Sequence, residues 1–200
     1  EPRPPAGDYP GRMEPVILRT SRLELTLPRE SDADAITEAC QDPGIQRYTS
    51  VPVPYGREHA EGFIAQVPQD WEAGRNLTWV IREEDSLVGT IGLYRLEGNG
   101  NGELGFWMAP SARGGGRLEE AANAVIGWGY AADGLDLTRI EWRAVVGNIA
   151  SARVARRLGF RFEGTLRGAL VNAKYRDDGW IAALLRTDDR MPQPWPVLDD

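Results

Sequence analysis

The spacing of apolar residues along the chain predicts strands alternating with helices. Apolar and polar positions alternate over 16–27 and again over 138–146, which is typical of β-strands. Over 117–132 the apolar residues recur at steps of three and four, which predicts a helix. The other expected elements are helices over 31–41, 57–73 (broken or kinked at Pro68) and 148–158, and strands over 77–82, 87–96, 104–108, 160–170 and 174–186.

This order of elements predicts a mixed α/β domain built around one sheet. We expect the domain to span 16–188. Residues 1–15 contain five prolines and show no periodicity, so they are expected to form an extended or disordered leader. The proline-rich segment 189–200 is expected to be a tail appended to the domain.

A glycine-rich turn follows the apolar strand 104–108. Pro110 ends the strand, three glycines occupy 114–116, and the helical pattern starts at Arg117. The first N–H groups of a helix have no partner within the helix, and the helix dipole adds partial positive charge there. The turn therefore predicts an anion site for a phosphate or pyrophosphate, flanked by Arg113 and Arg117. The alternative is a flexible turn without a ligand.

Two common phosphate motifs do not fit this turn. A dinucleotide-binding G-x-G-x-x-G loop would need a third glycine where Glu119 stands, and a P-loop would need Lys-Ser or Lys-Thr after Gly116. The pattern Arg-x-x-Gly from Arg113 instead resembles the coenzyme A pyrophosphate loop of the GNAT acyltransferases. It departs from that loop at Leu118, where a small residue is usual.

A second motif lies over 148–160. Asn148 and Ser151 are followed by Leu158-Gly159-Phe160, which resembles the Asn-x-x-Ser…Leu-Gly-Phe segment of GNAT enzymes. Further segments are similar to the RimJ/RimL-like branch of ribosomal-protein N-terminal acetyltransferases: 18–23, 105–107, 163–167 and 175–178. The chain is thus identified as a member of the GNAT superfamily, with a resemblance that covers 16–188.

The resemblance implies a fold and a set of cofactor contacts. The sheet would be mostly antiparallel, with about seven strands and about four helices, and its fourth and fifth strands would splay apart. The pantetheine arm of coenzyme A would lie between them and bond to the backbone of Phe106, Trp107 and Met108. The pyrophosphate would be held by Arg113, Gly114, Gly115, Gly116, Arg117 and Leu118. Asn148 and Ser151 would contact the arm near the thioester, although Asn148 could also be only a helix cap.

The implied reaction moves an acetyl group from acetyl-CoA to a primary amine, by direct attack in a ternary complex. Glu103 is the expected base, directly or through a water chain, with a solvated strand-end carboxylate as the alternative. Many GNAT enzymes carry a tyrosine acid where this chain has Ala155, so Ser151 is the expected partner of the leaving thiolate. Because Ala155 stands in place of that tyrosine, the alternative is a protein that binds coenzyme A as a sensor and catalyses no reaction. The acceptor, a protein N-terminal amine or a small amine, and the acyl length stay open.

Composition narrows the remaining possibilities. The net charge of −7 argues against nucleic-acid binding, and no apolar run is long enough to span a membrane. The lone Cys40 and lone His59 exclude an internal disulfide and a Cys/His zinc site, so no metal is expected. Without a visible signal peptide, a cytoplasmic enzyme is expected, as a monomer or a homodimer. The acceptor side is expected from the loop 49–56, the helix 57–73 and the last strand pair.

Overall fold

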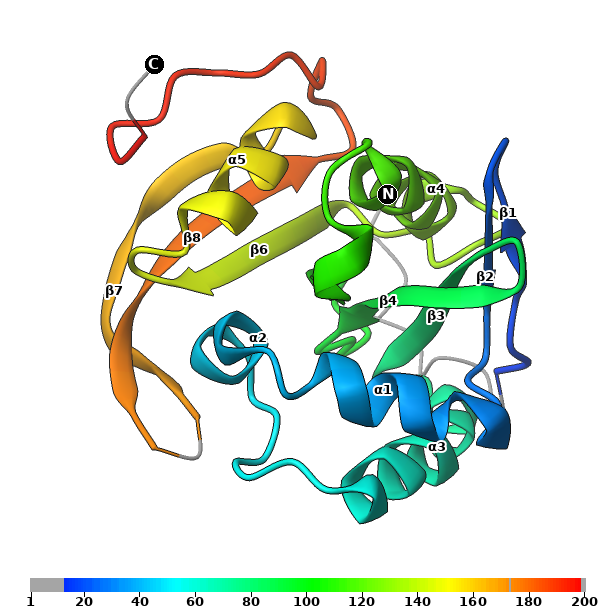
Figure 1. Ribbon diagram of the computed structural model, residues 1–200. Coiled ribbons are helices and arrows are strands. Elements are labelled where there is room, and N and C mark those ends of the chain that lie inside the picture. The colour runs from blue at the N-terminus through cyan, green and yellow to red at the C-terminus, as the bar shows by residue number, and fades with distance from the viewer. Residues whose placement is uncertain (1–12, 173, 199–200) are drawn as a thin grey trace.

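The computed structural model describes residues 13–172 and 174–198, which form an eight-stranded mixed sheet flanked by helices (Figure 1). The strand order is β1-β2-β3-β4-β5-β6-β8-β7. The strands are β1 (Leu18–Arg19), β2 (Leu23–Thr26), β3 (Leu77–Glu83), β4 (Ser86–Tyr94), β5 (Asn101–Met108), β6 (Arg139–Val145), β7 (Arg161–Val171) and β8 (Arg176–Leu185). The α-helices are α1 (Ala33–Ala39), α2 (Pro43–Tyr48), α3 (Arg57–Glu72), α4 (Arg117–Tyr130) and α5 (Ile149–Arg157).

The sheet is antiparallel except between β5 and β6, where it divides. These two strands pair over only three positions, Asn101–Glu103 against Arg139–Glu141, and then diverge. In Figure 1, β6, β7 and β8 with α5 lie on one side of the division and β1 to β4 with α4 on the other. The strands predicted as fourth and fifth are β5 and β6, so the predicted splay is confirmed.

Two buried clusters lie on opposite faces of β5. Leu104 and Met108 belong to the cluster under α4 and α5, whereas Trp107 packs on the cluster of α1, α2 and α3. This follows from the alternation of side chains along a strand. The end of β5 at the division therefore lies between two packed layers, and its last residues line a cleft there.

Two predicted elements are wrong in detail. The strand expected over 16–27 is a hairpin, because the chain turns at Thr20, whose N–H donates to the carbonyl of Leu23 at 2.9 Å. The segment after Asp42, for which no helix is predicted, begins helix α2. The Asp42 side chain accepts from the N–H of Ile45 at 2.9 Å, and Pro43 stands at the first helical position, where its missing N–H costs nothing.

Helix α3 continues through Pro68 from Arg57 to Glu72. Val67 before the proline and Trp71 in the next turn are buried, and their packing offsets the missing backbone hydrogen bond. In the described residues, no helix is long and apolar enough to cross a membrane.

The predicted C-terminal tail packs on the domain as far as it is described. Trp195 is 2% exposed and its ring centroid lies 5.5 Å from the rings of both Trp142 and Phe162. Its indole N–H donates to the carbonyl of Phe160 at 3.1 Å. The expectation of an appendage is therefore wrong for this segment. Of the predicted leader, 1–12 lie outside the described residues and Met13 packs against the core.

Replacing Trp195 with alanine should lower the free energy of unfolding by about 3–5 kcal/mol, because it empties a buried aromatic site. Urea unfolding followed by far-UV circular dichroism measures this. The control Met191→Ala changes a residue of the same segment that is 61% exposed, and should leave stability within about 0.5 kcal/mol. Equal effects of the two substitutions would contradict the docking of the tail.

Candidate active site

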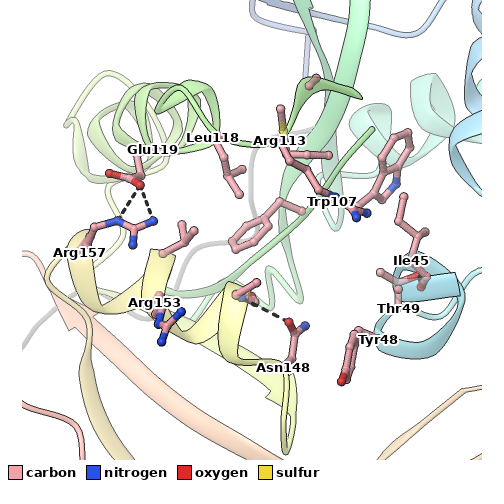
Figure 2. Close-up of a pocket in the computed structure, with 18 of the residues that line it drawn as sticks. Ile45, Tyr48, Thr49, Trp107, Arg113, Leu118, Glu119, Asn148, Arg153 and Arg157 are labelled. Atoms are coloured by element: carbon pink, nitrogen blue, oxygen red, sulfur yellow. Dashed lines mark hydrogen bonds and ion pairs between the residues drawn. The ribbon is translucent and has the colours of Figure 1, made fainter. Parts of the chain in front are cut away.

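A cleft of about 500 Å³ lies where β5 and β6 diverge (Figure 2). Residues of α2, the end of β5, the glycine turn, the start of α4 and one side of α5 line it. Of the residues predicted to bind the cofactor, those that line the cleft are Phe106, Trp107, Met108, Arg113, Gly114, Gly116, Leu118, Asn148 and Ser151. Segments far apart in the sequence thus meet around one hollow.

The glycine turn presents backbone N–H groups at one end of the cleft. Gly114, Gly115 and Gly116 have φ values of 85°, 63° and 74°, a left-handed conformation that glycine adopts without steric cost. Gly116 is the N-cap of α4, so the unpaired N–H groups of the first helical turn follow it directly. This end of the cleft therefore has the geometry of an anion site.

Arg113 stands at the same end but is already paired. Its Nη2 lies 2.7 Å from Oδ1 of Asp42, the residue that caps α2. The hydrogen bond from Arg113 lowers the pKa of the Asp42 carboxyl below its usual range. An incoming phosphate would share this guanidinium with a carboxylate, which moderates the positive charge at the site.

Gly115 and Arg117 do not line the cleft. The Arg117 side chain turns toward β3, where its Nε lies 2.7 Å from a carboxylate oxygen of Glu83. The Gly115 carbonyl accepts a hydrogen bond from Arg22. Arg117 can therefore reach a cleft ligand through its backbone N–H at the start of α4, but not through its guanidinium in this arrangement.

Asn148 and Ser151 lie at the start of α5. The Asn148 side chain caps the helix by accepting from the N–H of Ser151 at 3.3 Å (Figure 2). The indole N–H of Trp142 donates to Oγ of Ser151 at 2.9 Å. A hydroxyl has two acceptor sites and one donor, so this contact leaves the Ser151 O–H free to donate. No acceptor for that proton lies within the described part of the chain.

Two cations of the cleft were missed by the sequence analysis. Arg153 and Arg157 line it from α5, and Figure 2 shows Arg157 joined to Glu119 of α4, with 2.6 Å between Nη2 and Oε1. Among the residues the structure describes, Arg153 has no ion-pair partner. Their spacing of four on the helix capped by Asn148 is a signal that could have found them.

Glu103 does not line the cleft and lies at the last position of β5 before the strands diverge. Its Oε2 is buried and has no hydrogen-bond partner among the described residues. Nitrogens of Arg143 and Arg95 lie 3.6 and 3.7 Å from it. Burial raises the pKa of Glu103, because desolvation outweighs the attraction of the two guanidinium groups. Such a carboxylate accepts a proton more readily than an exposed one.

Helix α2 and the residue that follows it form one wall of the cleft, through Ile45, Tyr48 and Thr49. Figure 2 shows these residues across the hollow from α5. Arg47 of α2 makes a bidentate pair with Asp177 of β8, at 2.8 and 2.9 Å. Of the predicted loop 49–56, only Thr49 lines the cleft, so α2 provides most of the wall expected from that loop.

This architecture defines a class of protein: a sheet split between two parallel strands, with a glycine turn and a helix N-terminus at the split. Residues 22–161 match the protein family described as "Acetyltransferase (GNAT) domain", and the chain belongs to this family. The predicted family and the predicted enzyme class, an acetyltransferase, are thereby confirmed.

Relatives with acetyltransferase names share this class. The uncharacterized N-acetyltransferase YoaA of Bacillus subtilis (strain 168) is 30% identical over 76% of this chain and 86% of its own length. The ribosomal-protein-serine acetyltransferase of Escherichia coli is 36% identical over 54% of this chain and 60% of its own length. Among solved structures, the microcin C7 self-immunity acetyltransferase MccE, in complex with acetyl-CoA and AMP, has a TM-score of 0.75 at 21% identity. The match covers 83% of this chain and 93% of that one.

Proposed function

We propose that this enzyme transfers the acetyl group of acetyl-CoA to a primary amine by direct attack in a ternary complex. The observation that carries the proposal is the cleft at the split, which runs from the anion-binding turn before α4 to the wall formed by α2. A cofactor with a pyrophosphate at one end and a thioester at the other fits this polarity. MccE, which has a similar fold, binds acetyl-CoA, and this supports acetyl-CoA as the cofactor of this cleft.

Each end of the cofactor has candidate partners. The N–H of Gly116 and the unpaired N–H groups of the first turn of α4, with Arg113 and Arg153, are suited to the pyrophosphate. Backbone groups of Phe106 and Met108 face the division, whereas those of Trp107 point to Thr90 of β4, so Phe106 and Met108 can bond to the amides of the pantetheine arm. One of these N–H groups, aimed at the thioester oxygen, would stabilise the oxyanion of the tetrahedral intermediate.

The chemistry then needs one base and one proton donor. The amine nitrogen attacks the thioester carbon, and its proton passes through water to Glu103, which does not line the cleft itself. The C–S bond breaks as the tetrahedral intermediate collapses, and the electron pair leaves with sulfur. Ser151, whose O–H is free to donate, stabilises the departing thiolate by a hydrogen bond.

The acceptor that suits this machinery best is an α-amine. Its pKa near about 8 leaves a useful fraction neutral at physiological pH, whereas a lysine side chain near about 10.4 needs more help. The named activity of the E. coli relative, on a serine of a ribosomal protein, is in line with an N-terminal acceptor.

The proposal also includes a location and a domain boundary. The single buried Cys40 fits a protein of the reducing cytoplasm. Residues 16–188 form the catalytic domain.

A second candidate, a coenzyme A sensor without turnover, rests on Ala155. This residue occupies the place of the usual tyrosine acid and is 1% exposed, inside the packing of α5. A sensor would bind the cofactor and release no thiol.

The melting temperature with acetyl-CoA, coenzyme A and NAD tests the proposal. At about a hundred times the dissociation constant, a ligand adds about 2.7 kcal/mol to stability, which raises Tm by several degrees. We expect this rise with both thiol cofactors and none with NAD, and thiol release once a peptide beginning with alanine is added. No rise with acetyl-CoA would overturn the proposal, and binding without release to any amine of a panel would favour the sensor.

A further inference from the structure

The glycine turn is held from its outer side by a group of residues that the cleft does not contain. Arg22, at the turn between β1 and β2, donates from Nη1 to the carbonyl of Gly115 at 3.0 Å. The same guanidinium lies against Glu120 of α4, with 2.7 Å from Nε and 2.6 Å from Nη2 to Oε2. One side chain thus ties the middle of the glycine turn to the first turns of the helix that follows it.

Glu120 is itself fixed by the hairpin. Its Oε1 accepts from the hydroxyls of Thr20 and Ser21 and from the N–H of Arg22, at 2.5, 3.1 and 3.1 Å. Although burial acts to raise it, the pKa of Glu120 falls to about 2 under these hydrogen bonds and the one from Arg22. Glu120 is therefore a carboxylate at every physiological pH and anchors Arg22 in one direction.

The bond to Gly115 has a consequence for the next peptide group. In a planar trans peptide, the carbonyl of one residue and the N–H of the next point in opposite directions. Since the Gly115 carbonyl points to Arg22, the N–H of Gly116 points away from Arg22. Arg22 is not among the cleft residues, whereas Gly116 is.

We propose that Thr20, Ser21, Arg22 and Glu120 form a clamp that positions the pyrophosphate-binding turn. The inference rests on the proposed function, because it assigns a role toward the same cofactor. Three consecutive glycines have unusual backbone freedom, which a free turn would lose on binding. Ordering one residue costs about 1–2 kcal/mol, or about five- to thirtyfold in affinity, and the clamp removes that loss in advance.

The sign of one substitution separates positioning from simple electrostatics. Glu120→Gln deletes a negative charge near the pyrophosphate, so a purely electrostatic effect would tighten acetyl-CoA binding. The clamp predicts the reverse, a binding about five- to thirtyfold weaker, because Arg22 loses its anchor. Arg22→Gln should weaken binding to a similar degree, and Arg22→Lys, which keeps the charge but not the two-directional contact, should not restore it.

The experiment measures Kd for acetyl-CoA and kcat/KM for acetyl-CoA and for S-acetyl-pantetheine, a thioester without the pyrophosphate. We expect the clamp variants to lose affinity and kcat/KM with acetyl-CoA only. The matched control Arg19→Gln alters an exposed arginine of the same hairpin that pairs with Glu24, and it should behave as wild type.

Several outcomes would overturn the clamp. Tighter or unchanged acetyl-CoA binding in Glu120→Gln would do so, as would full recovery in Arg22→Lys or equal losses with both thioesters. If a glutamine variant does not fold, as judged by its Tm, Arg22→Lys and Thr20→Val carry the same comparison. A wild-type protein that binds no acetyl-CoA would instead overturn the proposed function, and the clamp with it.

Discussion

Replacing Gly116 with aspartate is expected to weaken acetyl-CoA binding by about 10³-fold. Two unit charges about 4 Å apart repel by about 4 kcal/mol at an effective dielectric constant of about 20. Gly116 lines the cleft at the start of α4, so a negative charge placed there repels the pyrophosphate. The nearest atom to an added Cβ is Nη2 of Arg22, at 3.8 Å, so the side chain has room, and the new carboxylate also competes with the carbonyl of Gly115 for that guanidinium. Isothermal titration calorimetry measures the loss.

The matched control is Gly116→Asn, which has nearly the same shape but no charge. Asparagine and aspartate both tolerate the left-handed conformation that φ of 74° requires, and both are good N-caps. We therefore expect similar Tm values for the two variants without ligand, and a far smaller loss of affinity in the asparagine variant. Equal affinities in the two variants would sink the assignment of this turn to the pyrophosphate.

Replacing Glu103 with glutamine should lower kcat by about 10²-fold or more, the usual range for a general base. The Kd for acetyl-CoA should hardly change, because Glu103 is not among the residues that line the cleft. Since the pKa of Glu103 is raised in the folded protein, its charged form lowers stability at neutral pH. The neutral variant is thus expected to melt no lower than wild type.

The pH dependence of kcat/KM gives an independent test. A base must be deprotonated, so wild-type activity should rise with pH through the raised pKa of Glu103 and again through that of the amine. In Glu103→Gln, only the rise of kcat/KM that follows deprotonation of the amine should remain. Glu163→Gln, a change to a half-exposed carboxylate paired with Arg139, is the control. Wild-type turnover in Glu103→Gln would remove this residue as the base.

Much of the fold followed from local patterns. The glycines at 114–116 and the helical periodicity from Arg117 give the turn and α4, and the apolar run 104–108 gives the strand before them. These signals are local, so neighbouring residues suffice to specify them. Helix α2 was not predicted because Pro43-Gly44 is typical of a turn. Asp42 before a proline is, however, also typical of the first residues of a helix.

Long-range packing could not be predicted in the same way. The partner of Arg117 is Glu83, and that of Arg22 is the carbonyl of Gly115, contacts that only the folded sheet brings together. Trp195 looked like part of a proline-rich tail because nothing near it in the sequence marks its contact with Trp142. The candidate site was therefore predictable in its backbone and less so in the side chains that hold that backbone.

The split of the sheet also limits how stable this protein can become. Pairing with β6 ends at Glu103, so 104–108 have no ladder partner on that side within the described strands. Each net backbone hydrogen bond is worth about 0.5–1.5 kcal/mol, so substitutions that drew β5 and β6 together would be favoured by any selection for heat resistance alone. They would also fill the cleft. Substitutions that raise the stability of this enzyme should therefore be sought at the surface and in the helices. The diverging parts of β5 and β6 should be left unchanged, because there a gain in stability would cost activity.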